Sequence, residues 1–452
     1  MRVLLLSTYE LGRQPVALAA PAASVRRSGH EVRAVDLAVE ELTDVDVSWA
    51  ERVAISVPMH TATRLADEIA RAIADAHPDL PVALFGLYAG VGSVDVAARF
   101  EGEYEPDLLR WAAGELDGIH RHLGRSDLGV PDRTGLPGLA QYARLEHRGS
   151  TVLAGAVETS HGCRHRCRHC PIPAVYDGRI RVVPRDDVLT DIDNLVAAGA
   201  RHITFGDADF LNAPAHSLSV LETAHHTHPD ITFDATIKVE HILGHAELWP
   251  RLAELNLLFV VSAFESMADD TLEILDKGHT VADMARAVDL TRETGIHLRP
   301  TWLPFFPWTT PDDVARIFEF IDTLGLTGST DPVQLSIKLL VPKGSLLANH
   351  PVMTPHLDHY DNDALTWRWG FDDPETAVLH KELEAIAANA SDCGQEAAAT
   401  IDEMRQAVSR VSGRHLPPPS GPVVVAPRLT ESWFCCAEPT EGQSVSIRLR
   451  PR

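Results

Sequence analysis

The first 130 residues alternate between short apolar runs and longer amphipathic stretches. Apolar runs of about four to eight residues are typical of buried strands, and apolar residues spaced by three or four positions are typical of helices. The strands are expected within residues 1–12, 30–37, 52–60 and 81–90, and the helices within 14–29 and 63–77. Strand and helix in alternation predict a doubly wound, Rossmann-like α/β domain with a parallel sheet. Residues 90–115 are expected to form a connecting loop and a helix.

The alternation pauses at a glycine- and proline-rich connector, residues 128–139, and resumes near residue 150. Further strands are expected within residues 151–160, 202–210, 258–266, 297–306 and 333–342, with an amphipathic helix at 186–200. About six strand–helix units over residues 150–350 predict a partial parallel (β/α) barrel, whose chemistry lies at the carboxyl ends of its strands.

The pattern changes again over residues 351–452. Residues 380–411 are rich in alanine and helical in spacing, and residues 414–427 form a proline-rich linker. Three units are therefore predicted: a Rossmann-like domain at 1–130, a barrel at 150–350, and a helical C-terminal region with an extended tail at 351–452.

The net charge of the chain disfavours two classes of binding partner. The 452 residues carry a net charge of −24, from 64 acidic against 40 basic residues. This balance disfavours nucleic acid and anionic membranes as partners, because both attract basic surfaces. The N-terminus does not resemble a secretory signal, and no apolar run approaches the roughly 18 residues of a membrane span. We expect a soluble cytoplasmic protein.

Five of the six cysteines fall in two tight clusters. Cys163, Cys167 and Cys170 lie within eight residues, Cys435 and Cys436 are adjacent near the end, and Cys393 stands alone. A disulfide framework in a chain of this length would be more spread out, so metal ligation or redox chemistry is favoured. Cys393, on an alanine-rich helix, is expected to be inert core.

The three-cysteine loop favours an iron–sulfur cluster. A 4Fe–4S cluster is held by cysteine thiolates, usually one per iron, so three cysteines leave one iron open for a substrate or cofactor. Pro171 and Pro173 keep the following backbone from continuing as a helix. The alternative is a structural zinc site completed by a distant histidine, although zinc usually takes two well-separated ligand pairs.

The spacing Cys163-x3-Cys167-x2-Cys170, after a strand that opens a barrel, resembles the signature of the radical S-adenosylmethionine (SAM) superfamily. The resemblance implies that SAM binds the open iron of a 4Fe–4S cluster and is cleaved reductively to a 5′-deoxyadenosyl radical. In that family an aromatic residue before the third cysteine touches the adenine. His169 stands there in this sequence, and its flat ring is expected to serve.

Other segments resemble the SAM-contacting strand ends of the same family. The resemblance implies that Gly206, Asp207 and Asp209 lie near the methionine amino group, where carboxylates would hold an ammonium. An ordinary acidic turn is the alternative. Polar contacts to the ribose are expected from Thr236, Lys238 or Glu240, and Glu265 and Ser266 are expected at the next strand tip. Lys277 and Gly278 close the following helix. A simple C-cap is the alternative to a role in the site.

The order of domains resembles the cobalamin-binding subfamily of radical SAM enzymes. The resemblance implies that a corrin lies against the strand ends of the first domain, for which the candidates are Ser56, Pro58, Phe85, Gly86 and Tyr88. The Asp-x-His-x-x-Gly motif that ligates cobalt in other proteins is absent. A doubly wound domain without cofactor, used for substrate binding or oligomerisation, is the alternative, because this fold hosts many functions.

The ending SWFCCAEP, residues 432–439, resembles the CUAEP/CCAEP-tail radical SAM proteins, in which the first position of the pair is variable between selenocysteine and cysteine. A tail that tolerates selenium is expected to take part in the chemistry, because selenium adds nucleophilicity rather than packing. Cys435 and Cys436 are therefore predicted to engage the substrate. Two small apolar residues in a terminal strand are the alternative. The histidines at 225, 226 and 228 are expected at a surface helix end rather than in a metal site.

Together these features predict an enzyme of the transferase type that uses a 4Fe–4S cluster, SAM and cobalamin to modify a small molecule. The product is a methylated carbon or a new carbon–heteroatom bond; because vicinal thiols bind soft metalloids, a carbon–arsenic bond is one version. A reductase, flavodoxin or ferredoxin is the expected electron donor. An iron–sulfur redox sensor or electron-transfer protein without SAM turnover is the alternative function.

Overall fold

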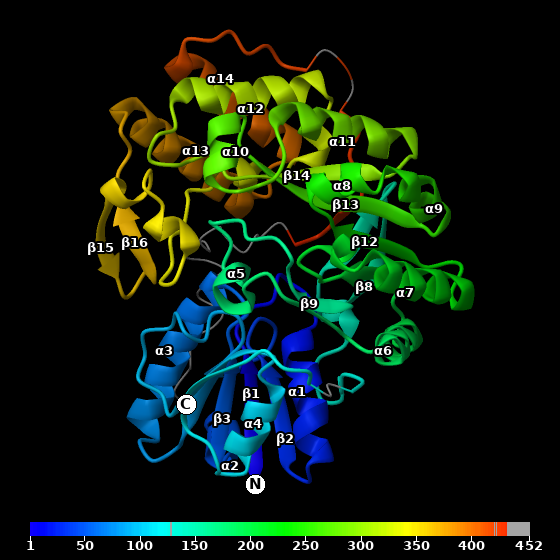
Figure 1. Ribbon diagram of the computed structural model, residues 1–452, viewed down its shortest axis with the longest axis vertical. Coiled ribbons are helices and arrows are strands. Elements are labelled where there is room, and N and C mark those ends of the chain that lie inside the picture. The colour runs from blue at the N-terminus through cyan, green and yellow to red at the C-terminus, as the bar shows by residue number, and fades with distance from the viewer. Residues whose placement is uncertain (127–128, 420, 422, 432–452) are drawn as a thin grey trace.

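The computed structural model describes residues 1–126, 129–419, 421 and 423–431. The N-terminal part is a six-stranded sheet with helices on both faces, shown in blue and cyan in Figure 1. All six strands are parallel, in the order β2-β1-β3-β4-β5-β6. The elements are β1 (Arg2–Ser7), α1 (Val16–Arg27), β2 (Glu31–Asp36), α2 (Asp44–Trp49), β3 (Arg52–Ser56), α3 (His60–Ala76), β4 (Val82–Phe85), β5 (Ala98–Gly102), α4 (Glu105–Ala112) and β6 (Gly118–His122).

The predicted Rossmann-like domain is confirmed, with one correction. Residues 90–115 contain strand β5 as well as the expected loop and helix, and β6 adds a further strand. The segment ARFEG of β5 was not recognised because Arg99 and Glu101 interrupt its apolar pattern. Their charges are satisfied inside the fold: Arg99 donates to Ala89 O at 2.7 Å, and Glu101 pairs with Arg121 at 2.8 Å.

The second part is a curled sheet in the order β14-β13-β12-β11-β8-β7-β17. Its five strands from β8 to β14 are parallel, and α-helices cover the outer face of this predicted partial barrel (Figure 1). The elements are β7 (Arg144–His147), β8 (Ser150–Val157), β9 (Ser160–Gly162), α5 (Ile172–Tyr176), β10 (Ile180–Val182), α6 (Arg185–Ala197), β11 (His202–Phe205), α7 (Pro214–Thr227), β12 (Thr232–Thr236), α8 (Val239–Gly244), α9 (Trp249–Glu254), β13 (Leu257–Glu265), α10 (Asp269–Ile274), α11 (Val281–Glu293), β14 (His297–Trp302) and α12 (Pro311–Thr323).

The strand expected within residues 333–342 does not form. A 3-10 turn covers Pro332–Ser336, and only an isolated bridge joins Phe305 to Lys338. The reason lies in the partner segment, where Pro304 and Pro307 flank the bridge. Proline has no N–H to offer a neighbouring strand, so a ladder cannot extend on either side.

The C-terminal region packs onto the barrel. A hairpin, β15 (Leu357–Asp361) and β16 (Thr366–Trp369), precedes the helices α13 (Pro374–Cys393) and α14 (Ala397–Ser412). Leu379, Leu383, Ile401 and Val408 of these helices belong to the same hydrophobic core as the barrel. Cys393 is exposed in the last turn of α13, so the expectation that it lies in the core is wrong. Among the described helices, none is both long and apolar enough to cross a membrane.

The last described strand, β17 (Arg428–Leu429), lies at the edge of the barrel sheet. It is antiparallel to β7, which is itself antiparallel to β8, so β17 runs in the same direction as β8. Thr430 and Glu431, the last described residues, therefore lie on the side of the carboxyl edge of the barrel strands. An ideal Cβ at Gly12, in the loop after β1, would lie 2.9 Å from Glu431 Cβ, which places Glu431 against the first domain.

The carboxyl edges of the two sheets face each other. His161, just after β8, lies 3.1 Å from the carboxylate of Glu103, which follows β5. The connector between the domains is also fixed, because Arg133 forms a two-point ion pair with Asp191 of α6 at 2.8 Å and donates to Gln14 at 2.9 Å. In Figure 1, β9 and α5 lie at this junction.

Candidate active site

The cysteine loop begins where β8 ends, and the carboxylate of Asp207 holds its first residues. Asp207 accepts hydrogen bonds from Thr159 N at 2.9 Å, Thr159 Oγ1 at 2.7 Å and Ser160 Oγ at 2.6 Å. Burial raises the pKa of Asp207 to about 6, although these hydrogen bonds lower it. The predicted ligand residue Asp207 thus anchors the loop from β11, and its contact with the methionine amino group stays a prediction.

Two contacts that sequence reasoning missed fix the rest of the loop. The buried Asn212 Oδ1 accepts from Arg164 N at 3.2 Å and lies 3.8 Å from Cys163 Sγ. On the other side, Arg168 N donates to Leu275 O at 2.8 Å. The loop backbone is therefore held from two sides of the barrel before any metal binds.

The three thiols suit a metal cluster. Cys163, Cys167 and Cys170 are free of disulfides and are buried or half-buried. Burial raises the pKa of Cys163, and it raises the pKa of Cys170 to about 12, with smaller contributions from the neighbouring thiols. Such thiols lose their protons when a metal ligates them.

A buried cation lies beside these thiols. Burial alone would lower the pKa of Lys277, but Glu265, Cys167 and Cys170 raise it, so its ammonium stays charged beside the loop. Lys277 Nζ is 3.2 Å from Glu265 Oε1, and only 3% of Lys277 is exposed. Lys277 is thus more than a helix cap, and its charge complements an anionic cluster–thiolate assembly.

Glu265 also holds His169, the residue that stands before the third cysteine. His169 Nε2 lies 3.1 Å from Glu265 Oε1. Burial would raise the pKa of Glu265, but Lys277 and His169 lower it to about 2. Glu265 has φ = 68°, in the left-handed region that a non-glycine residue rarely adopts. This strain at the tip of β13 aims the carboxylate at the cysteine loop.

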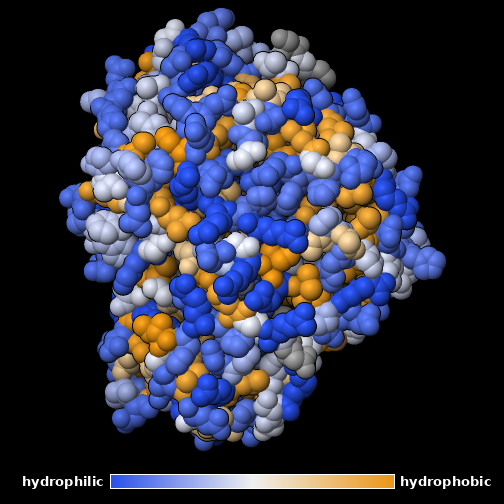
Figure 2. Space-filling model, viewed as in Figure 1, coloured by the Kyte–Doolittle hydropathy of each residue, from blue (hydrophilic) through white to orange (hydrophobic). Residues whose placement is uncertain are grey.

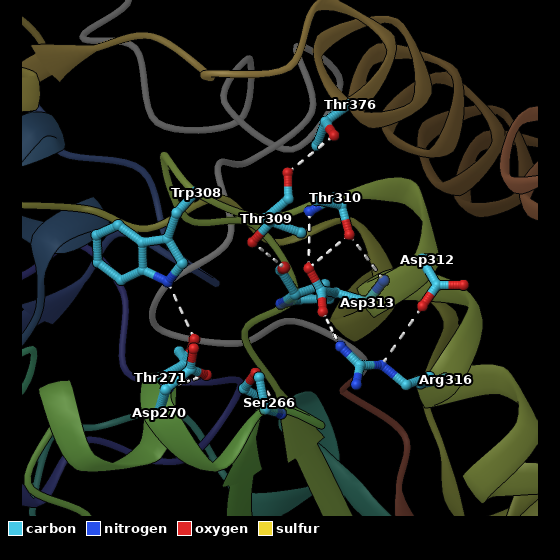
Figure 3. A network of polar contacts seen from close by, with 12 residues as sticks. Ser266, Asp270, Thr271, Trp308, Thr309, Thr310, Asp312, Asp313, Arg316 and Thr376 are labelled. Atoms are coloured by element: carbon cyan, nitrogen blue, oxygen red, sulfur yellow. Dashed lines mark hydrogen bonds and ion pairs between the residues drawn. The ribbon is translucent and has the colours of Figure 1, made fainter.

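A polar network behind the strand tip keeps α10 in place and with it the segment that leads to Lys277. Trp308 Nε1, in the loop after β14, donates to Thr271 Oγ1 at 3.0 Å, as Figure 3 shows. Thr310 and Asp313 form a capping box at the start of α12. Thr376 Oγ1 ties α13 to Thr309 O at 2.8 Å.

A chain of hydrogen bonds joins Lys238, His165 and His241 beside Asp209, whose Oδ2 also accepts from Lys238 N at 3.2 Å. Lys238 Nζ lies 3.0 Å from His165 Nδ1, His165 Nε2 lies 3.2 Å from His241 Nε2, and His241 Nδ1 lies 2.9 Å from Asp209 Oδ2. With Lys238 donating to His165 Nδ1, His165 is left to donate from Nε2 to His241 Nε2. His241 Nδ1 faces the Asp209 carboxylate but lacks hydrogen-bond geometry to it. Burial, Lys238 and His241 lower the pKa of His165, in agreement with a neutral ring.

The same side chains have the spacing of a metal site. Ligand atoms of His165, Asp209 and His241 lie within 4.8 Å of one another. A bound cation would nevertheless lie beside the Lys238 ammonium, whose nearest carboxylate is Glu240 at 2.9 Å. The hydrogen-bonded chain explains the arrangement without that repulsion.

The remaining barrel predictions lie at the same edge. Gly206 follows β11, and an ideal Cβ there would lie 3.3 Å from Glu158 Cγ. Thr236 is half-buried at the end of β12, and Ser266 follows Glu265 and is buried. The strand tips thus gather around the cysteine loop, as expected for a parallel barrel.

The five candidate residues of the first domain lie in or beside two loops that are joined through their backbones, and some of their side chains are buried in the core. The loops after β3 and β4 are joined by Val57 N donating to Phe85 O at 2.8 Å and Tyr88 N donating to Val57 O at 3.0 Å. Gly86 has φ = 118°, and its ideal Cβ would lie 3.1 Å from Val57 O, so a side chain is excluded there. Ser56 and Phe85 are buried, and the Phe85 ring packs on Tyr104 at 4.9 Å. Of the five, Pro58 is half-buried and Tyr88 is buried.

The model of the Radical SAM superfamily matches residues 157–321, from the end of β8 through α12. This segment carries all three clustered cysteines and the strand tips around them. Residues 157–321 therefore form a radical SAM domain. A 4Fe–4S cluster and SAM are the cofactors of a radical SAM domain, and Cys163, Cys167 and Cys170 stay its predicted cluster ligands.

Similarity extends beyond the radical SAM domain. The hopanoid C-2 methylase of Rhodopseudomonas palustris (strain TIE-1) is 24% identical over 303 residues, which cover 64% of this chain and 56% of the methylase. The apo structure of the cobalamin-dependent SAM radical enzyme OxsB superposes with a TM-score of 0.68 at 14% identity, over 91% of this chain and 72% of OxsB.

A third similar protein is the radical SAM methyltransferase TsrM from Kitasatospora setae. Its structure superposes with a TM-score of 0.53 at 20% identity, over 73% of this chain and 72% of TsrM. These structural likenesses show a shared fold. The chain spans a little over half the length of the curated relatives that it matches first.

Several carboxyl groups that sequence reasoning missed are buried where the first domain meets the radical SAM domain. Burial, Glu158 and Asp36 raise the pKa of Glu10 to about 8, and burial raises the pKa of Glu105 to about 7. Burial would lower the pKa of His161, but Glu103 and Glu158 raise it well above its usual value. No local motif marks these residues, because they come together only when the two sheet edges meet.

A large open cavity lies beside β17. Its volume is about 1070 Å³, and it extends from Arg64 of α3 past the 331–340 segment and the hairpin to α13 and Arg428–Thr430. None of its described lining residues belongs to the cysteine loop. It borders the open side of the radical SAM domain, next to the start of the C-terminal tail.

Cys435 and Cys436 lie outside the described residues, so their predicted role is taken up below as a proposal. The histidines at 225 and 226 lie in the last turn of α7, and His228 Nε2 contacts Asp193 Oδ1 at 2.6 Å, at the helix end as expected.

Proposed function

We propose that the chain is a radical SAM methyltransferase that acts on a small molecule with the help of cobalamin. The observation that carries the proposal is the meeting of two carboxyl sheet edges, with the cysteine loop between them, seen in the 3.1 Å contact of His161 with Glu103. In open α/β sheets ligands bind beyond the carboxyl ends of the strands. Two such edges facing each other bring a second cofactor and SAM to one space.

The chain's own residues supply binding and electrostatics in the radical SAM domain. Reductive cleavage of the SAM sulfonium is the chemistry that the cluster supplies when bound. Lys277 places a buried positive charge beside the cluster thiolates, and Glu265 fixes both Lys277 and the His169 ring. Asp209, whose Oδ2 lies 2.9 Å from His241 Nδ1, is the carboxylate assigned to the methionine ammonium.

Cobalamin is proposed for the edge of the first domain. The similar proteins OxsB and the hopanoid methylase support it, because the first is described as cobalamin-dependent and the second as a methylase. The loops after β3 and β4 fit a broad planar ligand through their backbone, with Gly86 leaving no side chain between them. Pro58 and Tyr88 are assigned to the contact, and Ser56 and Phe85 to its support from within the core.

The tail cysteines are proposed to engage the substrate. β17 directs the following residues toward the carboxyl edge, and Thr430 N donates to Arg144 O at 2.8 Å, which ties the chain down before the tail begins. Cys435 is four residues beyond Glu431, a reach of at most about 14 Å. Arg428, Leu429 and Thr430 line the large cavity, so the tail starts at its rim.

Methyl transfer is proposed over carbon–heteroatom bond formation. The matched methylase and methyltransferase favour it. Nothing in the described residues or in the matched proteins favours a carbon–arsenic product. The redox-sensor alternative is disfavoured because the similar proteins are a methylase and a methyltransferase.

The first experiment tests SAM cleavage. The reconstituted chain with SAM and dithionite is expected to form 5′-deoxyadenosine, and Cys167→Ala is expected to abolish it together with cluster binding. Cys393→Ala is the matched control, since this exposed thiol lies on α13 outside the cluster loop. An intact cluster without 5′-deoxyadenosine would contradict the proposal.

Two further measurements test the methyl carrier and the tail. Chain supplied with hydroxocobalamin is expected to retain the corrin absorbance after gel filtration, and methyl-labelled SAM is expected to label the bound corrin. The double variant Cys435→Ala/Cys436→Ala is expected to keep cluster, corrin and 5′-deoxyadenosine formation but to lose product. If no corrin is retained, the proposal that cobalamin carries the methyl group is wrong. If the double variant still forms product, the proposal that the tail cysteines engage the substrate is wrong.

A further inference from the structure

The cysteine loop is basic in a chain that is strongly acidic overall. Residues 161–181 contain five arginines and one acid, whereas the whole chain has a net charge of −24. Arg168 turns inward, toward Glu273 O and Ile274 O at 3.0 and 2.7 Å. Arg164, Arg166 and Arg179 are exposed, and Arg181 is half-buried, so most of the local charge is presented to solvent.

These arginines form one surface with two from the first domain. Pairing of β9 with β10 places Arg181 opposite His161, and Gly178 packs on Arg164 and Arg166. Arg181 Nε donates to Gly124 O at 3.0 Å, and Arg121 donates to Ala174 O at 2.9 Å. We call this the arginine surface; its members are Arg121, Arg125, Arg164, Arg166, Arg179 and Arg181.

Much of this charge is not neutralised. Arg125, Arg164 and Arg179 are exposed, and within the described part of the chain Arg164 and Arg179 have no ion pair. Arg166 pairs with the exposed Asp177 at 2.7 Å, and Arg121 pairs with the buried Glu101. In Figure 2 the most hydrophilic residues, in deep blue, gather across the middle of this face where the two domains meet.

We propose that the arginine surface is the docking site of an acidic one-electron carrier protein of the flavodoxin type. The proposal rests on the proposed function, because cleavage of SAM consumes one electron that the chain cannot supply. The carrier is oxidised by one electron and the cluster is reduced by one. That electron then breaks one carbon–sulfur bond of SAM, which yields methionine and a 5′-deoxyadenosyl radical.

The position of the surface suits this role. Arg164 and Arg166 lie between the predicted cluster cysteines in the chain, so a partner seated on them lies next to the cysteine loop. The whole chain has a net charge of −24 even with these arginines counted, so the rest of its surface repels an acidic partner. An acidic carrier is attracted by the arginine surface and repelled by the rest of the chain, so it docks productively at the arginine surface. Such steering acts mainly on the association rate.

The test compares two reductants on one preparation. The double variant Arg125→Glu/Arg179→Glu leaves the cysteine loop unchanged between Cys163 and Cys170. The matched control is Arg286→Glu/Arg410→Glu, the same charge change on α11 and α14, where the two side chains are 68% and 61% exposed. Bleaching of the cluster absorbance is followed with reduced flavodoxin and, separately, with dithionite.

Flavodoxin-driven bleaching is expected to slow at least about tenfold in the test variant and little in the control. Dithionite-driven bleaching is expected to match the unmodified chain. The flavodoxin rate of the unmodified chain is expected to fall as salt rises, because screening weakens exposed charges. Equal loss in both variants, or a salt-independent rate, would overturn the proposal. The readout is independent of SAM, so a failure of the proposed function would appear separately as bleaching without 5′-deoxyadenosine.

Discussion

Lys277 Nζ and Glu265 Oε1 lie 3.2 Å apart in a buried pocket against the cysteine loop. The pair joins the tip of β13 to the segment after α10, and it lies between the thiols and the His169 ring. Each charge offsets the cost of burying the other, because an isolated charge at this depth would be strongly unfavourable.

Lys277→Met is expected to lower the free energy of unfolding by about 3–5 kcal/mol, because it leaves Glu265 buried with only His169 as a partner. The double variant Lys277→Met/Glu265→Gln is expected to be more stable than the single variant, since no carboxylate is then stranded. Urea denaturation of the cluster-free chains measures both. A double variant less stable than the single one would mean that Glu265 does not depend on Lys277.

Glu10 makes stability depend on pH. Its carboxylate accepts from Val16 N at 3.1 Å and Ala17 N at 3.3 Å at the start of α1, yet burial raises its pKa to about 8. An unfolded glutamate titrates near 4.5, so the folded state holds an extra proton between about pH 4.5 and 8. The stabilisation is complete below that range and is lost as pH rises through it.

Glu10→Gln is expected to flatten this dependence. Between pH 6 and 8.5 the unmodified chain should lose on the order of 2–3 kcal/mol from this group, and the variant should lose correspondingly less. Some slope remains, because Glu105 titrates at about 7 in the same junction. Glu68→Gln, at an exposed position of α3, is the control and should keep the full slope. Parallel slopes in all three chains would show that Glu10 is ionised throughout.

Asp207 is expected to decide whether the cysteine loop accepts a cluster. Asp207→Asn replaces an acceptor of three hydrogen bonds by an amide, whose NH₂ faces the Thr159 or Ser160 donors. The iron content after reconstitution should fall several-fold. Asp234→Asn is the matched control, a buried carboxylate that accepts from Thr204 Oγ1 at 2.6 Å but does not touch the loop. Equal iron in both variants would contradict the anchoring role.

The sequence predicted the layers well because most of the strands that build them contain an uninterrupted apolar run. β1 and β8 are examples, and the three cysteines lie close together in the chain, so their chemistry was visible without a fold. β5 was missed because its charges are neutralised by Ala89 O and Arg121, partners that only the tertiary structure supplies. A strand was expected at 333–342 because this segment has an apolar pattern. The pattern carries no information about Pro304 and Pro307 in the segment that it would have to pair with.

Site residues divide in the same way. Glu265 and Lys238 were reached through the family resemblance, but no local signal reveals that Glu265 is held by Lys277 or that Lys238 begins a chain through His165 and His241. Such pairs depend on three-dimensional register. Glu10 and Glu105 were not predicted for the same reason, since residues distant in sequence, such as Glu158 and His161, shape the surroundings of these carboxyl groups.

The exit of the tail offers the sharpest test of its role. Gly12 has φ = 66°, and a Cβ there would lie 2.6 Å from Glu431 Oε2 and 2.9 Å from Glu431 Cβ. Gly12→Ala therefore both strains the backbone, by about 1 kcal/mol, and pushes Glu431 away from the first domain. The expected result is a loss of product with normal iron content and normal 5′-deoxyadenosine formation.

Gly29→Ala is the matched control for this effect. Gly29 has φ = 83° after α1, but nothing lies within 4 Å of its ideal Cβ. It should show a similar strain cost in urea denaturation while keeping the rate of product formation. If Gly12→Ala also keeps that rate, the contact between Glu431 and the first domain does not position the tail. If both variants lose activity in proportion to their stability, the effect belongs to the first domain as a whole.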